Sequence, residues 1–195
     1  MKCQKAIESL KNNGFSVQYF ETRQQACDYL KEQLKGEIIG FGGSMTARDL
    51  GLYELLGEQN TVCWHWKNPA DIKRYPEFTT YITSANAISE TGELVNIDAN
   101  GNRLASTLYG PPKVYFVCGH NKITPDLTTA LDRARNIAAP INAKRLGRKT
   151  PCAVTGKCHN CSSPDRICNG ISIHLRPMSS AKVTEVILIG EDLGA

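Results

Sequence analysis

The chain has 195 residues, of which 41% are hydrophobic and 22% charged, and its formal net charge is +4 at pH 7. We interpret residues 1–195 as a single domain, because this length and apolar content suit one substantial core and no apolar run is long enough to span a membrane. The mild positive charge comes without a nucleic-acid recognition motif, so nucleic acid is not expected as a partner. An N-terminus without the apolar stretch of a secretory signal predicts a cytoplasmic protein, in which thiols stay reduced.

The N-terminal part of the chain alternates helical and strand patterns. An amphipathic helical pattern ends near Gly14, and apolar residues then alternate over 15–20 as in a strand. Thr22 is placed to cap a second helix, after which residues 37–41 have the composition of a buried strand. Helix, strand, helix and strand in this order predict an α/β fold with a mainly parallel sheet flanked by helices.

A glycine-rich loop follows the predicted strand at 37–41 and precedes a helical pattern that continues to Leu56. Such a turn presents backbone N–H groups to an anion. It is not a dinucleotide fingerprint, because Met45 replaces the third glycine, and it is not a P-loop, because no Gly-Lys-Ser/Thr follows. The alternative is a tight turn that needs glycine only for its backbone. We predict that a small anionic or phosphate-bearing ligand binds to Gly42, Gly43, Ser44 and Thr46.

The middle of the chain is rich in strand signals. A strand is predicted over 61–66, and two turn-forming dipeptides, Thr91-Gly92 and Asn100-Gly101, divide the segment that follows. Glu90 comes just before the first of these turns and is expected to face the glycine loop, where its carboxylate can act as a nucleophile or general base. The Asn86 amide can orient a substrate. The alternative for Glu90 is an exposed turn residue. Further strands are predicted near 86–90, 93–98, 103–108 and 113–118.

Helical signals return in the C-terminal part. Thr124-Pro125 predicts a helix start with threonine as the N-cap, and the apolar face of this helix extends until Pro140 interrupts it. A second helix is expected over 141–147. Residues 182–190 have the pattern of a last buried strand, and residues 150–169 form a cysteine-rich insert before it.

The insert holds four of the chain's eight cysteines, in the spacing Cys152-x5-Cys158-x2-Cys161-x6-Cys168. This spacing matches neither a two-knuckle zinc ribbon nor the bacterial ferredoxin run. Apolar side chains are scarce in the insert, so without a central ion it has little to bury. We predict that the four cysteines bind a metal or cluster, with disulfides or free thiols as the alternatives. The other four cysteines are expected in the core, and His159 and His174 are expected to be ordinary surface histidines.

Several longer runs resemble the lactate-utilisation (LUD) domain family, and the similarity spans nearly the whole chain. The resemblance implies an α/β fold related to ribose-5-phosphate isomerase and CoA transferases (NagB/RpiA/CoA-transferase-like). In that wider group a Gly-Ser-Thr loop holds phosphate, and CoA transferases have a catalytic glutamate in a Ser-Glu-Asn-Gly context. Ser89-Glu90-Thr91-Gly92 is similar, with threonine in place of asparagine. The runs that carry the resemblance are GFGGSMTARDLGL, TSANAISETGELVNIDANGNRLAS, YGPPKVYFVCGHNKI, RARNIAAPINAKRL and VILIGEDLG.

Family members are linked to the oxidation of L-lactate to pyruvate alongside iron–sulfur partner subunits. This redox setting favours a [4Fe–4S] cluster on the four cysteines, with zinc as the alternative. Our first interpretation is therefore a LUD-type redox accessory protein, a component of an L-lactate oxidising (oxidoreductase) system, that binds a small anionic metabolite. The alternatives are a CoA-transferase-like, isomerase or hydrolase enzyme that uses Glu90 and holds structural zinc, and a non-catalytic ligand sensor. A homo-oligomer is left open.

Overall fold

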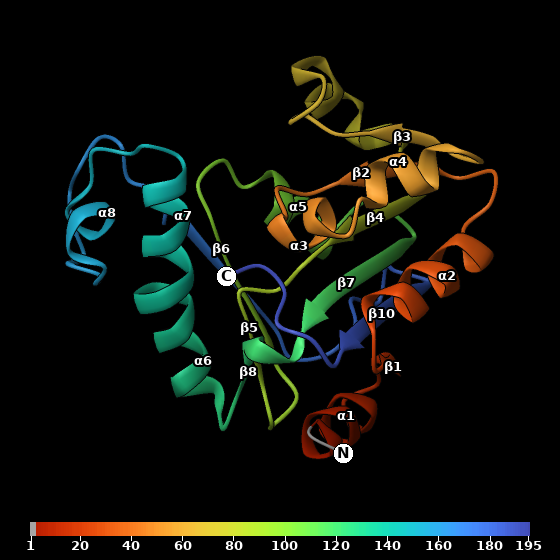
Figure 1. Cartoon of the computed structure of the whole chain (residues 1–195), viewed down its shortest axis with the longest axis horizontal. Coiled ribbons are helices and arrows are strands. Elements are labelled where there is room, and N and C mark those ends of the chain that lie inside the picture. Colours follow the sequence, from red (N-terminus) through yellow and green to blue (C-terminus); the bar gives the residue numbers. More distant parts are fainter. Residues whose placement is uncertain (1–2) are drawn as a thin grey trace.

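The computed structural model describes residues 3–195 and contains a central sheet of six parallel strands (Figure 1). Neighbouring strands pair in parallel throughout. The sheet is buried on both faces, which explains the continuous apolar runs of its central strands. The predicted α/β fold class is confirmed. In spatial order the strands are β1 (Ser16–Phe20), β10 (Val183–Ile189), β7 (Lys113–Gly119), β4 (Thr80–Thr83), β2 (Ile38–Phe41) and β3 (Thr61–Cys63).

Helices cover one face of this sheet and a helix with a second sheet covers the other. On the first face lie α2 (Arg23–Gln33), α3 (Met45–Asp49) and α4 (Leu52–Gly57), whose apolar side chains share a core with alternate residues of the strands. On the second face, α1 (Gln4–Asn12) shares a core with the small sheet. Successive side chains of a strand point to opposite faces, so both cores draw on the same strands.

Local sequence signals explain the boundaries of these helices. Thr22 accepts a hydrogen bond from the Gln25 backbone and completes a capping box at the start of α2, as the sequence predicted. The helical pattern after the glycine loop, by contrast, forms two short helices rather than one. Gly51 separates α3 from α4 with a φ of 62°, a left-handed conformation that glycine adopts without strain.

The second sheet has four strands in the order β8 (Ile123–Thr124), β5 (Ala87–Ser89), β6 (Leu94–Asp98) and β9 (Gly170–His174). β6 pairs antiparallel with both β5 and β9, whereas β8 joins β5 in parallel. We predicted β5 and β6 near their observed places. The sequence patterns did not indicate β9, which returns the chain from the cysteine-rich segment to the sheet.

The strand predicted over 103–108 is wrong, because these residues form the helix α5 (Asn102–Leu108). Gly101 precedes the helix with a φ of 80° and turns the chain away from β6 instead of folding it back as a hairpin. The Asp98 carboxylate fixes this turn, since it accepts hydrogen bonds from the backbone N–H groups of Ala99 at 2.7 Å and Arg103 at 3.0 Å. These local bonds outweigh the strand propensity of the sequence.

A helical arm extends from the small sheet (Figure 1). It comprises α6 (Leu127–Arg133), one π-helical turn over Ala134–Ala138, α7 (Ala139–Arg145) and α8 (Pro151–Thr155). Asp126, not Thr124, caps α6 by accepting a hydrogen bond from the Thr129 N–H, and Thr124 belongs to β8. Pro140 does not end the helix, because it lies in the first turn of α7 directly after the π turn, where its missing N–H is tolerated.

The remaining regular structure in the described residues consists of two 3₁₀ helices, Pro69–Glu77 between β3 and β4 and His120–Lys122 between β7 and β8. Within residues 3–195, no helix combines the length and the apolar character needed to cross a bilayer.

Candidate functional site

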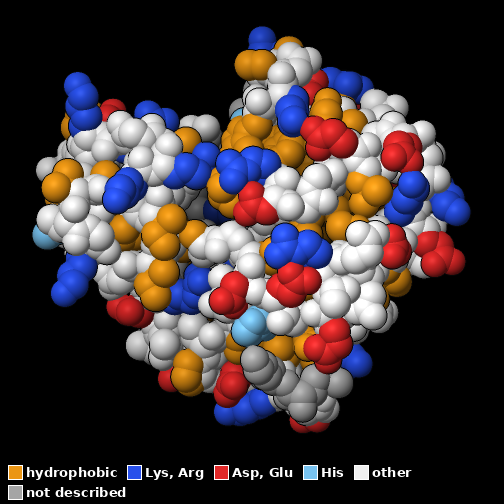
Figure 2. Space-filling model, in the orientation of Figure 1, with side chains coloured by type: hydrophobic (Ala, Val, Ile, Leu, Met, Phe, Trp, Pro, Cys, Tyr) orange, Lys and Arg blue, Asp and Glu red, His pale blue; other side chains and the backbone are white. Residues whose placement is uncertain are grey.

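A cavity of about 300 Å³ lies at the C-terminal edge of the central sheet. The segments that follow β2, β3, β4 and β7 all contribute to its wall, because parallel strands bring their C-terminal ends to one edge. Figure 2 shows the molecule hollowed between the helical arm and the part that carries α3 and α4, with lysine and arginine side chains gathered there. In open parallel sheets this edge is where ligands bind. We therefore take it as the candidate site.

The wall of this cavity is strongly cationic. Arg103, Lys122, Arg145 and Arg148 line it, and Asp98 is the one acidic side chain among the described residues of the wall. Lys122 and Arg103 lie at the protected bottom of the cavity, whereas Arg145 and Arg148 are exposed at its rim. The surplus of cations over carboxylates favours an anion in the cavity.

Lys122 is buried directly after β7, with 3% of its surface exposed. Its ammonium nitrogen Nζ donates hydrogen bonds to the Ser84 hydroxyl at 2.9 Å and the Thr46 hydroxyl at 3.0 Å. Burial lowers the pKa of Lys122 to about 8, and the nearby guanidinium groups of Arg133 and Arg103 also lower it. The lysine is therefore a buried cation whose closest described polar partners are neutral hydroxyl groups.

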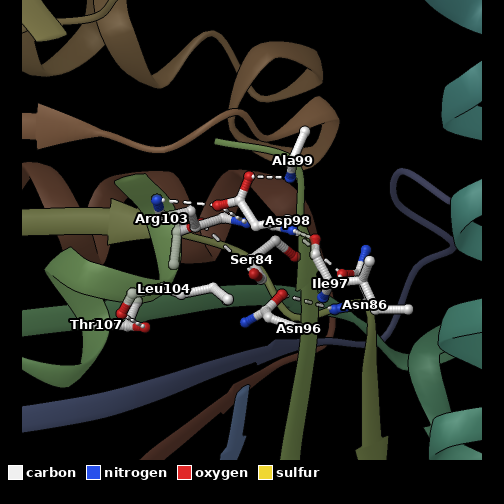
Figure 3. Close-up of polar contacts among 10 residues, drawn as sticks. Ser84, Asn86, Asn96, Ile97, Asp98, Ala99, Arg103, Leu104 and Thr107 are labelled. Atoms are coloured by element: carbon white, nitrogen blue, oxygen red, sulfur yellow. Dashed lines mark hydrogen bonds and ion pairs between the residues drawn. The ribbon is translucent and has the colours of Figure 1, made fainter. Parts of the chain in front are cut away.

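Arg103 comes from the start of α5 and reaches into a polar cluster between β5 and β6 (Figure 3). Its guanidinium donates to the Asn86 side-chain oxygen at 3.2 Å and to the Ile97 carbonyl, and it lies 3.9 Å from the Asp98 carboxylate. The Asn86 side-chain oxygen also accepts a hydrogen bond from the Ile97 N–H at 2.7 Å. Burial lowers the pKa of Arg103, and the negative charge of Asp98 acts in the opposite direction. This network holds Arg103 and Asn86 on the cavity wall.

The structure places the predicted glycine-loop residues in different roles. Gly43 and Ser44 line the cavity, and Ser44 also caps α3 by accepting a hydrogen bond from the Ala47 N–H. Thr46 is fully buried, does not line the cavity itself and hydrogen-bonds to two residues that do, Lys122 and Ser84. Gly42 packs inside the sheet, where an added Cβ would lie 2.7 Å from the Thr83 hydroxyl. The glycine loop therefore forms one side of the site, with Gly42 behind it.

Glu90 lies apart from this site. It follows β5 at the turn toward β6, whereas the cavity is lined by residues at the opposite end of β5, such as Asn86. The Glu90 carboxylate forms an ion pair with Lys5 at 3.0 Å, and both side chains are solvent-accessible. Our expectation that Glu90 faces the glycine loop was wrong, because the length of β5 separates them. A catalytic role for Glu90 stays a prediction without support from its position.

The four cysteines of the insert line one second cavity, of about 170 Å³. Cys158 accepts a hydrogen bond from the Asn160 N–H at 3.4 Å, and the Arg135 guanidinium lies 3.9 Å from the same sulfur. Burial raises the pKa of Cys168. Four thiols in one cavity, with N–H donors near the Cys158 sulfur, are of the residue type that binds a metal or cluster as thiolates. Their Sγ atoms are free thiols, and among residues 3–195 no three His, Cys, Asp or Glu side chains are arranged closely enough to hold an ion.

The two cavities are neighbours. Ile97 of β6 and Ala139 of α7 each line both of them. The cationic cavity and the cysteine cavity therefore share part of a wall.

Sequence reasoning missed the main cations of the site. Arg103 and Lys122 fall within runs that carry the family resemblance, but neither stands in a pattern that indicates a binding role. Lys122 follows a predicted strand, and polar residues at strand ends are candidates for this edge. The expectation for His174 was also wrong. Its side chain is fully buried, lies 3.2 Å from the Thr107 carbonyl through Nε2 and has a pKa lowered by burial. His159 is exposed, and Cys3, Cys27, Cys63 and Cys118 are buried, as predicted.

Comparison with known proteins gives one family and one similar solved structure. The sequence pattern of the LUD domain matches residues 3–189. The crystal structure of a DUF162 family protein from Deinococcus radiodurans is similar to this chain, with a TM-score of 0.57 and 10% sequence identity, over 97% of this chain and 96% of that one. At this identity the likeness shows the fold alone. No curated protein matches the chain.

Proposed function

The chain belongs to the LUD domain family, and from that premise we propose that it is a lactate-utilisation-type redox accessory protein which binds a small anionic metabolite in the cationic cavity. The observation that carries the proposal is the pair of protected cations, Lys122 and Arg103, at the base of a cavity whose described wall has one acidic side chain. Charge-assisted hydrogen bonds from such groups are each worth about 1.5–3 kcal/mol. Two of them suffice to hold a carboxylate or phosphate.

The dimensions of the cavity limit the size of the ligand. A volume of about 300 Å³ is at the small end of the range for ligand sites. Arg145 stacks over the Trp66 ring at 4.9 Å and, with Arg148, is placed at the rim to attract an anion before it reaches the base. The Ser84 hydroxyl and the Asn86 amide can then orient its neutral groups. A small carboxylate or phosphate compound suits this arrangement.

The proposal includes a [4Fe–4S] cluster on Cys152, Cys158, Cys161 and Cys168, with zinc as the alternative. When bound, a cluster supplies one-electron chemistry. The support is the shared cavity of the four thiols and the donors near Cys158, because hydrogen bonds to sulfur tune such clusters. The wall formed by Ile97 and Ala139 makes the two sites adjacent. Iron–sulfur subunits of a lactate-oxidising complex are the partners that the family implies.

Calorimetric titration tests the anion site. Lactate, pyruvate and inorganic phosphate are added to the wild type, with lactamide as a neutral analogue. We expect at least one anion to bind and lactamide not to bind. The double variant Arg145→Met/Arg148→Met should bind about tenfold more weakly, because it removes two rim charges worth up to about 1 kcal/mol each. Arg176→Met, an exposed cation outside the cavity, is the matched control and should not change the affinity. Absence of anion binding, or equal binding of lactamide, would refute the proposal.

A further inference from the structure

The amine of Lys122 has an environment that anion binding alone does not require. It lies at the end of a buried side chain, lines the cavity and donates to two hydroxyl groups, those of Ser84 and Thr46. Arg103 already offers a permanent positive charge to the same cavity. Within residues 3–195 no carboxylate forms an ion pair with Lys122, although the Asp49 charge favours its protonated form. This second, titratable cation therefore adds the cost of its own burial to the folded state. Such an amine is suited to react as well as to bind.

The neutral form of this amine is accessible near physiological pH. The pKa of Lys122 is lowered to about 8 by burial and by Arg133 and Arg103, so about one tenth of the side chain is unprotonated at pH 7 and about half at pH 8. Desolvation and neighbouring cations are the two devices by which enzymes make a lysine nucleophilic. An ordinary surface lysine is almost entirely protonated under the same conditions.

We propose that Lys122 forms an imine with the carbonyl group of a small anionic oxo compound, either an oxo acid or a phosphorylated aldehyde or ketone. The inference rests on the proposed anion site, because it assigns a chemical class to the ligand of the same cavity. The neutral Lys122 nitrogen attacks the carbonyl carbon and gives one proton to the carbonyl oxygen, which forms a carbinolamine. The carbinolamine then loses its hydroxyl group together with the second nitrogen proton as water, which leaves a C=N bond. One water is released for each imine, and no oxidant or reductant is needed.

The neighbours of Lys122 fit the separate steps of this reaction. The Ser84 hydroxyl, 2.9 Å from the nitrogen, is placed to pass a proton to the departing hydroxyl of the carbinolamine. Thr46 holds the amine from the other side. Arg103 on the cavity wall supplies the charge that holds the carboxylate or phosphate of the ligand. The Gly194 backbone lies close to the amine, since an added Cβ there would lie 3.3 Å from the Lys122 nitrogen.

Lys113 provides a matched control on the same strand. It lies at the opposite, N-terminal end of β7 and forms an ion pair with Glu37 at 2.6 Å. Its amine is therefore neither in the cavity nor free of a carboxylate partner. A covalent adduct that depends on the cavity should form on Lys122 and not on Lys113.

Borohydride trapping tests the inference. The full-length protein is incubated near pH 8 with pyruvate or glycolaldehyde phosphate, reduced briefly with sodium borohydride and mapped by peptide mass spectrometry. We expect one stable adduct per chain, located on Lys122 and at least tenfold more abundant there than on Lys113. Lys122→Met should abolish this adduct and Lys113→Met should leave it unchanged. Acetone, which has the carbonyl but no charge, should label Lys122 at least tenfold less.

The outcomes separate this inference from the proposed function. If calorimetry shows that the two probes or other anions bind while Lys122 stays unlabelled in the wild type, the imine is refuted and the anion site stands. If neither binding nor labelling occurs, both fail. Equal labelling by acetone would refute the anionic class of the carbonyl compound. Lys122→Arg keeps the charge but not the nucleophile, so it should retain anion binding and give no adduct.

Discussion

The Lys122 amine lies 2.9 Å from the Ser84 hydroxyl, although 38 positions separate the two residues in the sequence. β4 and β7 are neighbouring parallel strands, so the residues that follow their C-terminal ends meet at one edge of the sheet. The contact is therefore a consequence of strand order. It places a buried cation at the bottom of the cavity from two segments whose residues show no binding pattern in the sequence.

Anion affinity should depend on pH through Lys122. Its pKa of about 8 means that the side chain is charged below this pH and neutral above it. Lactate binding, measured by calorimetry, should therefore be strongest below pH 8 and weaken as the pH rises through about 8 to 9. The lactate carboxylate does not titrate in this range, and Arg103 stays charged throughout. An affinity that is constant over this range would remove Lys122 from the binding site.

Replacing Lys122 with methionine should stabilise the fold. The pKa of this lysine is lower in the folded protein than its ordinary value of 10.5, so burying the charged form costs free energy at neutral pH. Wild-type stability should accordingly rise with pH between about 8 and 10.5, where the unfolded chain binds more protons. Lys122→Met should raise the free energy of unfolding at pH 7 by about 1–3 kcal/mol in urea denaturation.

The matched change on the same strand should act in the opposite direction. Lys113→Met leaves the partly buried Glu37 carboxylate without its ion-pair partner, so it should lower the free energy of unfolding. Loss of stability in Lys122→Met comparable to that in Lys113→Met would mean that Lys122 is a structural residue.

The cysteine cavity gives a prediction about colour. Anaerobically purified protein should be brown, with broad absorption near about 400 nm from thiolate-to-iron charge transfer. Cys161→Ser should remove the absorption, because a site of four thiolates loses most of its affinity for the metal when one of the four is removed. Cys118→Ser should keep it, since Cys118 is a buried strand residue that contacts the Ala85 N–H. Colourless protein with one equivalent of zinc would contradict the redox interpretation, and protein with neither metal would contradict any ligand role.

Glu90→Gln should have little effect on stability, on lactate affinity or on the labelling of Lys122. The Glu90–Lys5 ion pair is solvent-accessible, and such pairs contribute about 0–1 kcal/mol. Lactate affinity and borohydride labelling of Lys122 should match the wild type, because Glu90 does not line the cavity. A large loss in either measurement would restore Glu90 as a functional residue and would require the turn after β5 to move toward the cavity.

The parts of the fold that were predictable are those in which local signals and packing agree. The capping residue Thr22 and the apolar face behind it specify α2, and the uninterrupted apolar run at the end of the chain specifies β10. The helix α5 was not predictable, because Asn100-Gly101 also suits a hairpin and the deciding Asp98 bonds depend on the turn that they stabilise. β9 was not predictable either, because its pairing with β6 joins segments that lie far apart in the sequence.

The residues of the candidate site likewise fall into those that the sequence predicted and those that it did not. The glycine loop and the grouped cysteines were visible in the sequence, because each consists of neighbouring residues with related chemistry. The pairing of Lys122 with Ser84 depends on strand order, and Arg103 reaches the cavity only because residues 102–108 are helical. The misplacement of Glu90 has a similar cause, since the sequence does not show which end of β5 meets the sheet edge.

The most direct test of the anion site is a crystal structure with lactate or inorganic phosphate bound. We expect electron density for the anion in the cavity at the C-terminal edge of the sheet, within hydrogen-bond distance of the Lys122 nitrogen or the Arg103 guanidinium. A fully occupied ligand elsewhere, with this cavity holding only water at ligand concentrations that saturate binding in solution, would contradict this expectation.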